Sequence, residues 1–420
     1  MGMNNTPASD RVHIGFFGRR NAGKSSVLNA VTGQDLAVVS DVKGTTTDPV
    51  YKAMELLPLG PVMMIDTPGI DDEGELGALR VRKSYQVLNK TDVAVLVVDA
   101  CRGMASEDRA LLARMKDKEI PCVIVCNKAD LCSGAERDGG GCPGGEPGQD
   151  GGLYPGGVPT LSVSAYTGQG ITALKECLAE LGKTQENGRR IVGDLLDPSD
   201  LTILVVPVDK AAPKGRLILP QQQTIRDILD ADAAALVLKE NELKGMLDVL
   251  GKKPKMVITD SQVFARVSAD TPDDILLTSF SILFARYKGN LESMVEGVRA
   301  LDRIGKGDKI LISEGCTHHR QCGDIGTVKL PAWIRRHTGT EPEFVFTSGT
   351  EFPDDLGDYR LVVHCGGCML NEREMKYRMK CAQDQSVPMT NYGIAIAYIQ
   401  GILKRSVQAF PHIAGLLEKE

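Results

Sequence analysis

One segment near the start of the 420-residue chain constrains its fold more than any other feature. Residues 18–25 read GRRNAGKS and fit the phosphate-binding loop pattern G-x-x-x-x-G-K-[ST]. The loop follows an apolar run at residues 14–17 and precedes an expected helix at residues 26–32, the strand–loop–helix context that the pattern requires. Its glycines let backbone N–H groups point at phosphate oxygens. The sequence therefore predicts a nucleotide-binding α/β domain in the first part of the chain.

Three more motifs follow in the order that a guanine nucleotide site needs. Residues 66–69 (DTPG), 127–130 (NKAD) and 164–165 (SA) each come directly after an apolar run of strand length. In the NKAD motif, Asp130 can accept hydrogen bonds from both the N1–H and the N2–H₂ donors of guanine, a pair that adenine lacks. Four signals at four strand ends make a chance match negligible, so the sequence predicts a GTP site.

Each motif residue has a physical task. Lys24 supplies a positive charge to the β- and γ-phosphates, and the Ser25 hydroxyl can ligate Mg²⁺. Asp66 can hold the same magnesium ion through water, and the N–H of Gly69 can sense the γ-phosphate. A backbone N–H in the segment 164–165 is expected to bind the guanine carbonyl.

The segment at residues 44–48 (GTTTD) resembles the G-T-T-x-D effector loop of the TrmE/Era-type bacterial GTPases. The resemblance implies that Thr46 is the second magnesium-ligating hydroxyl and that Asn21 holds a potassium ion in the arginine-finger position. Ile70, which follows the DTPG motif, cannot orient a water molecule, so another group must stabilise the developing charge. Residue chemistry alone leaves a second interpretation of Asn21 open, that it merely tolerates a tight loop conformation.

The motifs and this resemblance together define the candidate nucleotide-site residues. The candidate nucleotide-binding set is Gly18, Asn21, Ala22, Gly23, Lys24, Ser25, Ser26, Thr45, Thr46, Asp66, Gly69, Asn127, Lys128, Asp130, Ser164 and Ala165. Within it, Lys24, Thr46, Asp66 and Gly69 are the candidate catalytic residues. Arg19 and Arg20 remain open as charges that act within the same chain.

The pattern along the chain predicts an α/β protein with a P-loop GTPase domain followed by two smaller α/β domains. We place the domains at residues 1–185, 186–268 and 269–420. The Gly/Pro-rich segment 132–159 has too little apolar content to pack, which predicts a mobile surface loop. The apolar strands expected at 201–208 and 233–238 pair either within one sheet or across a two-fold axis. Further strands are expected at 93–99, 256–259, 309–313, 344–347 and 360–364.

Composition excludes several classes of protein and sets the expected compartment. The net charge is −6, so the chain lacks the overall basic excess typical of proteins that bind nucleic acid or membrane surfaces. No apolar run approaches the roughly 20 residues that span a bilayer, and the polar start does not resemble a signal peptide. These features predict a cytoplasmic protein, in which the 11 cysteines need an explanation other than a disulfide framework. Small core positions are expected for Cys101, Cys122, Cys126 and Cys177.

A second group of candidate ligands lies in the last third of the chain. Residues 316–318 (CTH) and 365–368 (CGGC) each follow an expected strand, so their side chains should meet at one sheet edge. Cys316, Cys365, Cys368 and His318 suit a closed Cys₃His zinc site. The three cysteines equally suit an iron–sulfur cluster with a non-cysteine fourth position. Spacing alone leaves both sites open.

A GTPase of this type followed by C-x-H and then C-x-x-C resembles the HydF family of FeFe-hydrogenase maturation GTPases over essentially the whole chain. The resemblance implies a 4Fe–4S cluster held by Cys316, Cys365 and Cys368, with His318 as a possible fourth ligand and His319 and Glu314 as lesser candidates. It implies that the second domain serves dimerisation and the third binds the cluster. It further implies a dimeric scaffold or carrier that hydrolyses GTP with stimulation by K⁺ and carries a transient di-iron subcluster. The implied partners are two radical-SAM maturation enzymes and the apo FeFe-hydrogenase.

The alternative is an RNA- or ribosome-associated TrmE/Era-like GTPase with a structural Cys₃His zinc site. The acidic charge balance and the lack of an evident basic RNA-binding module after the GTPase domain disfavour it.

Overall fold

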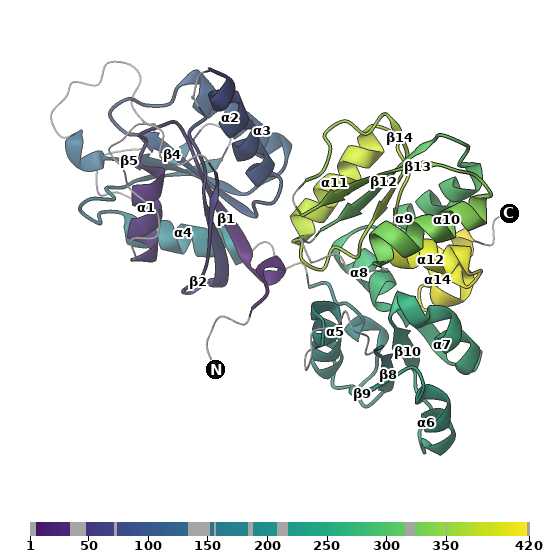
Figure 1. Ribbon diagram of the computed structural model, residues 1–420. Helices are drawn as coiled ribbons and strands as arrows, with labels where there is room; N and C mark the ends of the chain where they lie inside the picture. The colour runs from purple at the N-terminus through teal and green to yellow at the C-terminus, as the bar shows by residue number, and fades with distance from the viewer. Residues whose placement is uncertain are drawn as a thin grey trace. The chain divides into compact units, whose positions relative to one another are not determined.

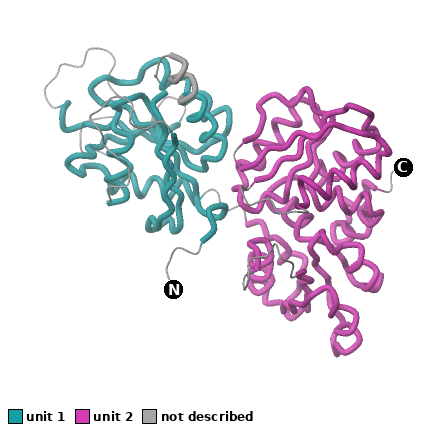
Figure 2. Tube along the Cα trace, viewed as in Figure 1, with its two compact units in different colours: residues 1–187 teal, residues 188–420 magenta. Residues whose placement is uncertain are grey.

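The computed structural model describes residues 6–33, 48–70, 74–132, 152–154, 157–183, 188–207, 217–315, 324–349 and 351–417. The chain divides into two compact units, Met1–Asn187 and Gly188–Glu420 (Figure 2). Within the described ranges, every helix is too short or too polar to cross a membrane. Each unit is an α/β fold with its own apolar core.

The first unit is built on a seven-stranded sheet of order β2-β3-β1-β4-β5-β7-β6 (Figure 1). Strands β1, β3, β4, β5 and β7 are parallel, while β2 and β6 run antiparallel at the two edges. The strands are β1 (Val12–Phe17), β2 (Val50–Leu56), β3 (Gly60–Asp66), β4 (Val93–Asp99), β5 (Cys122–Asn127), β6 (Gly152–Tyr154) and β7 (Val158–Ser162).

Helices cover both faces of this sheet, because neighbouring residues of a strand point to opposite faces. In β1, Phe16 packs with α1 and α4, whereas Phe17 packs with α2 and α3. The helices are α1 (Lys24–Thr32), α2 (Gly74–Leu88), α3 (Ser106–Asp117) and α4 (Ile171–Lys183). The chain leaves β1 at the point where the sheet order reverses, and open α/β sheets place their ligands at this switch point.

The second unit contains two four-stranded parallel sheets, of order β11-β10-β8-β9 and β13-β12-β14-β15. The first comprises β8 (Leu201–Val205), β9 (Ala234–Leu238), β10 (Met256–Thr259) and β11 (Leu276–Ser279). The other comprises β12 (Lys309–Glu314), β13 (Glu343–Ser348), β14 (Tyr359–His364) and β15 (Met389–Asn391).

One continuous apolar core joins the two sheets of the second unit. Helix α8 starts directly after β11 and contacts α5 on one side and α11 and α12 on the other, so it belongs to the packing of both sheets. The helices are α5 (Leu219–Leu229), α6 (Leu243–Val249), α7 (Phe264–Asp270), α8 (Phe280–Lys288), α9 (Leu291–Gly297), α10 (Leu330–Thr338), α11 (Glu372–Asp384), α12 (Tyr392–Ile399), α13 (Leu403–Ser406) and α14 (Pro411–Leu416).

The structure confirms the α/β class and the strands expected from apolar runs, and it adds elements that the sequence pattern did not indicate. β8 and β9 pair with each other inside the chain, which is the internal alternative for these strands. The sheet that contains them includes β11, so it continues past residue 268, where we predicted a domain boundary. The two domain boundaries stay predictions.

The Gly/Pro-rich segment is described only in part. Its residues 152–154 form β6, which pairs antiparallel with β7, so this piece belongs to the sheet and the expectation of a loop is wrong there. Tyr154 pairs with Val158 in that ladder, which means that backbone hydrogen bonds at a sheet edge order a stretch poor in apolar residues. Residues 133–151 and 155–156 lie outside the described residues.

Candidate functional site

The phosphate-binding loop joins β1 to α1 and passes through backbone conformations that favour glycine. Gly18 has φ +142° and Gly23 has φ +89°. A Cβ atom at Gly18 would lie 2.2 Å from the carbonyl oxygen of Val97, so no larger residue fits there. Asn21 has φ +59°, a left-handed conformation that asparagine adopts more readily than most residues. This curl suits a loop whose N–H groups converge on an anion.

Lys24 is the first residue of α1, and its side chain spans the loop from within. The residue is 8% exposed, and Nζ donates hydrogen bonds to the carbonyl oxygens of Gly18 (3.1 Å) and Arg19 (3.0 Å). The loop therefore surrounds an ammonium group, as expected where a lysine meets the β- and γ-phosphates. Ser26 lies in the first turn of the same helix, directly after the loop.

Ser25 and Asp66 bring the two predicted magnesium positions together. Ser25 Oγ donates to Asp66 Oδ2 at 2.5 Å. Burial raises the pKa of Asp66, and the hydrogen bond from Ser25 and the charge of Lys24 oppose that rise. Oδ1 of Asp66 is buried without a hydrogen-bond partner among the described residues. A buried carboxylate oxygen that lacks a donor fits a site for Mg²⁺ and its water, in which Ser25 would ligate the metal.

The DTPG motif approaches the phosphate loop directly. A Cβ atom at Gly69 would lie 3.1 Å from the backbone nitrogen of Arg20, so glycine is required by this close approach. Ser84 of α2 donates to the carbonyl oxygen of Pro68 at 3.1 Å, and Ile70 is buried. Thr45 and Thr46 lie outside the described residues.

Arg19 has a structural partner in α3. Its Nε donates to Asp108 Oδ2 at 3.0 Å and its Nη2 donates to the carbonyl oxygen of Gly103 at 3.0 Å. Asp108 is buried in α3. Arg19 therefore links the phosphate loop to α3.

Asn127 joins the predicted base-binding segments. The residue is 2% exposed, and its Nδ2 donates to the carbonyl oxygen of Ala22 at 3.1 Å. Its Oδ1 accepts the N–H of Ala165 at 3.1 Å, and the neighbouring Ser164 is fully buried. A Cβ atom at Gly23 would lie 2.2 Å from Asn127 Nδ2. Binding of the guanine carbonyl by the segment 164–165 stays a prediction, since in this structure the Ala165 N–H is bonded to Asn127.

Lys128 connects the NKAD motif to two other loops. It has φ +66°, and its Nζ donates to the carbonyl oxygen of Asn21 (2.8 Å) and to Asp99 Oδ2 (2.7 Å). Asp130 lies half-buried in the short 3₁₀ helix η3 (Ala129–Leu131) that follows. Sequence reasoning missed Asp99, although an acidic residue that ends the strand beside β5 was a usable signal.

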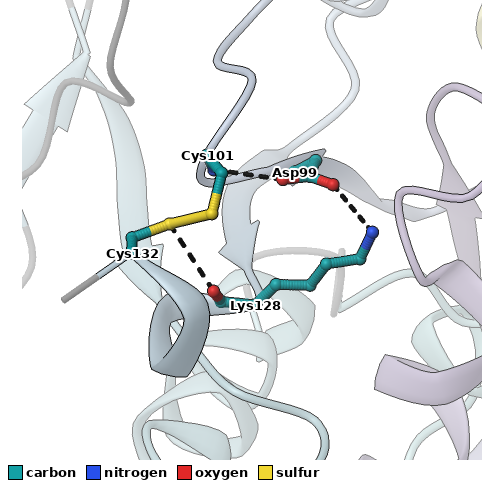
Figure 3. Close-up of a disulfide and its surroundings, with 4 residues drawn as sticks. All are labelled: Asp99, Cys101, Lys128 and Cys132. Atoms are coloured by element: carbon teal, nitrogen blue, oxygen red, sulfur yellow. Dashed lines mark hydrogen bonds and ion pairs between the residues drawn. A yellow bond between two sulfur atoms is a disulfide. The ribbon is translucent and has the colours of Figure 1, made fainter. Parts of the chain in front are cut away.

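A disulfide joins Cys101 to Cys132 beside this ion pair, and Figure 3 shows the arrangement. Two expectations are therefore wrong: Cys101 is exposed and not a core residue, and these two cysteines are not reduced thiols. The physical reason is topological. β4 and β5 are parallel neighbours, so the loops that follow them emerge at the same sheet edge, where Cys101 and Cys132 have Cα atoms 5.6 Å apart. Cys122 and Cys126 are buried as expected, while Cys177 is half-buried in α4.

The second predicted site lies at the carboxyl ends of β12 and β14. Cys365 directly follows β14, and its Sγ accepts the N–H of Gly315 (3.0 Å) and the N–H of Gly367 (3.4 Å). Gly315 follows β12 and precedes Cys316 in the sequence. Gly367 has φ +63°, and a Cβ atom there would lie 2.6 Å from Met375 Sδ, so this loop needs its glycine.

The chemistry of this loop fits a metal centre. Burial raises the pKa of Cys365 to about 11 and also raises that of Cys368, where the charge of Lys288 opposes the rise. A bound metal would reverse the effect, because coordination deprotonates a thiol. Amide N–H groups aimed at Cys365 Sγ would stabilise the resulting thiolate. Cys365 and Cys368 would hold the cluster, and bound iron would supply an inorganic site open to a further ligand.

A buried polar network supports the strand that leads into this loop. Arg378 is fully buried and donates to Glu374 Oε1 (2.8 Å) and to Nε2 of His364 (3.0 Å). Because arginine only donates, His364 carries its proton on Nδ1, which donates to the carbonyl oxygen of Cys365 at 2.7 Å. Burial and the neighbouring Arg378 lower the pKa of His364 to about 3, so the imidazole is neutral. The sequence did not indicate this network.

The remaining candidate ligands divide between described and undescribed residues. Cys316, His318 and His319 lie outside the described residues. Within the described ranges, no group of three or more His, Cys, Asp or Glu side chains is arranged to hold a metal ion. Glu314 is buried, and its Oε1 accepts a hydrogen bond from the Tyr392 hydroxyl at 3.3 Å.

Curated relatives match part of the chain. The tRNA modification GTPase MnmE of Synechococcus sp. (strain JA-3-3Ab) is 36% identical over 182 residues, which are 42% of this chain and 36% of that protein. GTPase Der of Prochlorococcus marinus (strain MIT 9313) is 32% identical over 223 residues, which are 51% of this chain and 48% of that protein. The chain thus spans about half or less of the length of these relatives.

Among solved structures, Era of Aquifex aeolicus bound to GDP and AlF₄⁻ is 17% identical, with a TM-score of 0.35, and the match covers 57% of this chain and 98% of that one. The S. thermophilus NFeoB protein bound to the same ligands is 21% identical, with a TM-score of 0.31. The match covers 41% of this chain and 64% of that one.

Three family models match separate parts of the chain. Residues 13–128 match the model described as 50S ribosome-binding GTPase. Residues 191–289 match the hydrogen maturase F dimerization domain, and residues 292–409 match the hydrogen maturase F tetramerization domain. The last two models cover more than half of the chain and include the C-x-x-C loop. With these two domains behind a P-loop GTPase domain, the chain belongs to the hydrogen maturase F (HydF) family.

Proposed function

We propose that this protein is a GTP-hydrolysing scaffold or carrier that binds a 4Fe–4S cluster and assembles or delivers the di-iron subcluster of FeFe-hydrogenase. One observation carries the cluster assignment within this family. The N–H of Gly315 donates to Cys365 Sγ at 3.0 Å, so the backbone just before Cys316 meets the C-x-x-C loop. The carboxyl end of β12 therefore meets the C-x-x-C loop, which supports Cys316, the next residue in the sequence, as a ligand together with Cys365 and Cys368. His318 is the proposed candidate for the fourth position.

GTP hydrolysis is assigned to the first unit. Lys24 would neutralise the β- and γ-phosphates, Ser25 and Thr46 would ligate Mg²⁺, and the Gly69 N–H would contact the γ-phosphate. Bound Mg²⁺ supplies positive charge to the leaving phosphate oxygens. Because no water-orienting glutamine follows the DTPG motif, Asn21 would hold a K⁺ ion, which would supply positive charge where negative charge develops during hydrolysis.

The proposed partners are two radical-SAM maturation enzymes and the apo hydrogenase, in the cytoplasm. The names of the two HydF family models support a homo-oligomer, and a dimer is the proposed minimal form. The proposal involves neither nucleic acid nor a membrane.

Metal analysis of anaerobically purified protein tests the cluster assignment. We expect about four iron and four sulfide per chain after reconstitution and a brown colour that dithionite bleaches, because iron–sulfur clusters are redox-active chromophores. One zinc per chain without iron or sulfide would overturn it. That result would favour an RNA- or ribosome-associated GTPase with a Cys₃His zinc site, the candidate that the 50S ribosome-binding GTPase match also suits.

A further inference from the structure

A buried lysine holds the C-x-x-C loop from the side of α8. Lys288 is the last residue of that helix and is 3% exposed. Its Nζ donates to the carbonyl oxygens of Cys368 (3.1 Å) and Leu370 (2.8 Å). The ammonium group therefore fixes the backbone at the end of the loop, while the N–H of Gly315 bonds to Cys365 at its start.

A buried ammonium group is costly unless negative charge or strong dipoles compensate it. The two carbonyl dipoles supply part of that compensation, and a negatively charged group bound beside the loop would supply more. A 4Fe–4S cluster with three thiolate ligands carries net negative charge, which increases on reduction. A fixed cation beside it stabilises the reduced form more than the oxidised form.

We propose that Lys288 is a positioning residue for the cluster loop and that its charge raises the reduction potential of the cluster. The inference rests on the proposed function, since it needs a cluster at Cys365 and Cys368. It assigns two separable roles: the hydrogen bonds to the carbonyl oxygens shape the loop, and the positive charge sets the potential.

The test measures iron and sulfide content and the reduction potential, by EPR-monitored titration, in the reconstituted full-length protein. Lys288→Met and Lys288→Gln remove the charge, and Lys288→Gln keeps a donor for one carbonyl oxygen. Lys288→Arg keeps both the charge and the donors. Lys376→Met removes a half-exposed lysine of α11 and serves as the matched control.

We expect Lys288→Gln to bind iron with a potential shifted to more negative values, and Lys288→Arg to restore most of that shift. Lys376→Met should leave the potential unchanged. Lys288→Met should shift the potential and also lose part of its iron. If Lys288→Met fails to fold, the potential of Lys288→Gln alone tests the inference. An unchanged potential in Lys288→Gln overturns the inference while leaving the proposed function intact. Absence of iron from the wild-type protein overturns both.

The disulfide in the first unit supports a second, independent inference. Cys101 follows β4, and Cys132 follows η3. The disulfide therefore ties the end of η3, the segment that carries Asp130, to the loop after β4. The N–H of Cys101 donates to Asp99 Oδ1 (3.0 Å), and Asp99 Oδ2 accepts from Lys128 at 2.7 Å (Figure 3). The bridge and the NKAD motif are thus mechanically connected.

We infer that this cysteine pair couples thiol redox state to guanine nucleotide exchange. In a reducing compartment such a bridge is transient. A small-molecule disulfide such as oxidised glutathione accepts the two electrons: its S–S bond breaks to give two thiols, the two cysteine protons are transferred, and the Cys101–Cys132 bond forms. The exposed Cys101 is the accessible sulfur for the first exchange step.

The bridged state holds the base-reading segment in its assembled arrangement, so the oxidised protein should release GDP more slowly than the reduced protein. We expect a roughly two- to tenfold difference in the dissociation rate, the range that corresponds to the net free energy of one hydrogen bond. Stopped-flow release of fluorescent GDP measures it, after treatment with oxidised glutathione or with dithiothreitol.

Cys101→Ser and Cys132→Ser should release GDP at the rate of the reduced wild-type protein under both treatments. Cys177→Ser is the matched control and should keep the redox response, because Cys177 lies in α4 away from the bridge. Equal rates for oxidised and reduced wild-type protein overturn this inference. So does mass spectrometry that finds Cys101 and Cys132 unpaired after oxidation.

Discussion

At the residue scale, Asn127 is the side chain that binds the loops of the nucleotide site to one another. Its amide donates to the loop after β1 and accepts from the loop after β7. Because Gly23 has no Cβ, the amide can lie directly against the phosphate loop. The base-binding and phosphate-binding segments are therefore connected by contacts within the protein, which reduces the ordering cost of nucleotide binding.

The specificity for guanine is expected to depend on the Asp130 carboxylate. Asp130→Asn replaces two acceptors with one acceptor and one donor, so GTP affinity should fall about 100-fold or more, the loss of two charge-assisted hydrogen bonds. The same change should raise affinity for xanthosine triphosphate, whose C2 carbonyl accepts a hydrogen bond. Isothermal titration calorimetry with GTP and with xanthosine triphosphate measures the two affinities.

Asp117→Asn is the control for this change, because Asp117 is exposed in α3 of the same unit. It should leave both affinities unchanged. If Asp130→Asn kept the wild-type affinity for GTP, that result would contradict the role assigned to Asp130 in guanine recognition.

Asn21 allows its two interpretations to be separated. Asn21→Ala and Asn21→Gly both remove the amide, but glycine retains the left-handed backbone conformation that Asn21 adopts at φ +59°. If the side chain binds potassium, both variants should lose stimulation of GTP hydrolysis when NaCl is replaced by KCl, with GTP affinity largely intact in Asn21→Gly. Stimulation that persists in Asn21→Gly would show that only the backbone conformation matters.

At the element scale, α11 carries two carboxylate–cation pairs of the same spacing in opposite environments. Glu374 and Arg378 are buried beside the strand that leads to the C-x-x-C loop, whereas Glu372 and Lys376 are partly exposed. Loss of one partner of a buried pair leaves the other charged side chain unpaired in the core, which is strongly destabilising. Loss of one partner of an exposed pair changes the stability little. The two pairs form an internal comparison on a single helix.

Arg378→Met should destabilise the second unit by about 3–5 kcal/mol, because Glu374 is left buried and unpaired. Lys376→Met should cost no more than about 0.5 kcal/mol. Urea unfolding followed by tryptophan fluorescence measures both, since Trp333 in α10 is the single tryptophan of the chain and reports on this unit.

The double variant Arg378→Met with Glu374→Met removes the stranded charge and should recover part of the stability. A cost for Arg378→Met similar to that of Lys376→Met would contradict the assigned role of the buried pair.

Much of the fold was predictable because buried parallel strands are nearly continuous apolar runs, and the motifs follow those strands directly. β2 and β15 were missed for opposite reasons. β2 is a mostly exposed edge strand without an apolar face, and β15 (Met389–Asn391) is too short to show a period. Arg378 and Lys288 were unpredictable from local pattern, because only the tertiary fold shows that these charged residues are buried. The Cys101–Cys132 disulfide could not be predicted without the strand order of the sheet, which places the two loops at the same edge.

At the scale of the whole molecule, the two predicted sites lie in different compact units (Figure 2). The GTP-site residues pack around the cores of the first unit, and the cysteine loop packs on the core of the second. Separate cores allow one site to be disabled without unfolding the other.

Cys365→Ala should therefore lose most of the bound iron and keep the GTP hydrolysis rate within about twofold, as expected for sites without a shared core. Iron analysis and phosphate release measure the two effects. Cys381→Ala, on α11, is the control and should keep both properties. Loss of GTP hydrolysis in Cys365→Ala would show that the two sites are energetically coupled.

The position of α8 decides how the protein can be dissected. A cut between residues 187 and 188 falls between the two compact units, whose apolar clusters are separate. A cut after Lys288 would instead expose Phe280, Leu283 and Phe284, which are buried in the core that both sheets share. The cysteine-bearing piece alone would then expose an apolar surface that promotes aggregation. Limited proteolysis should therefore yield one stable fragment from about residue 188 onward rather than two smaller ones.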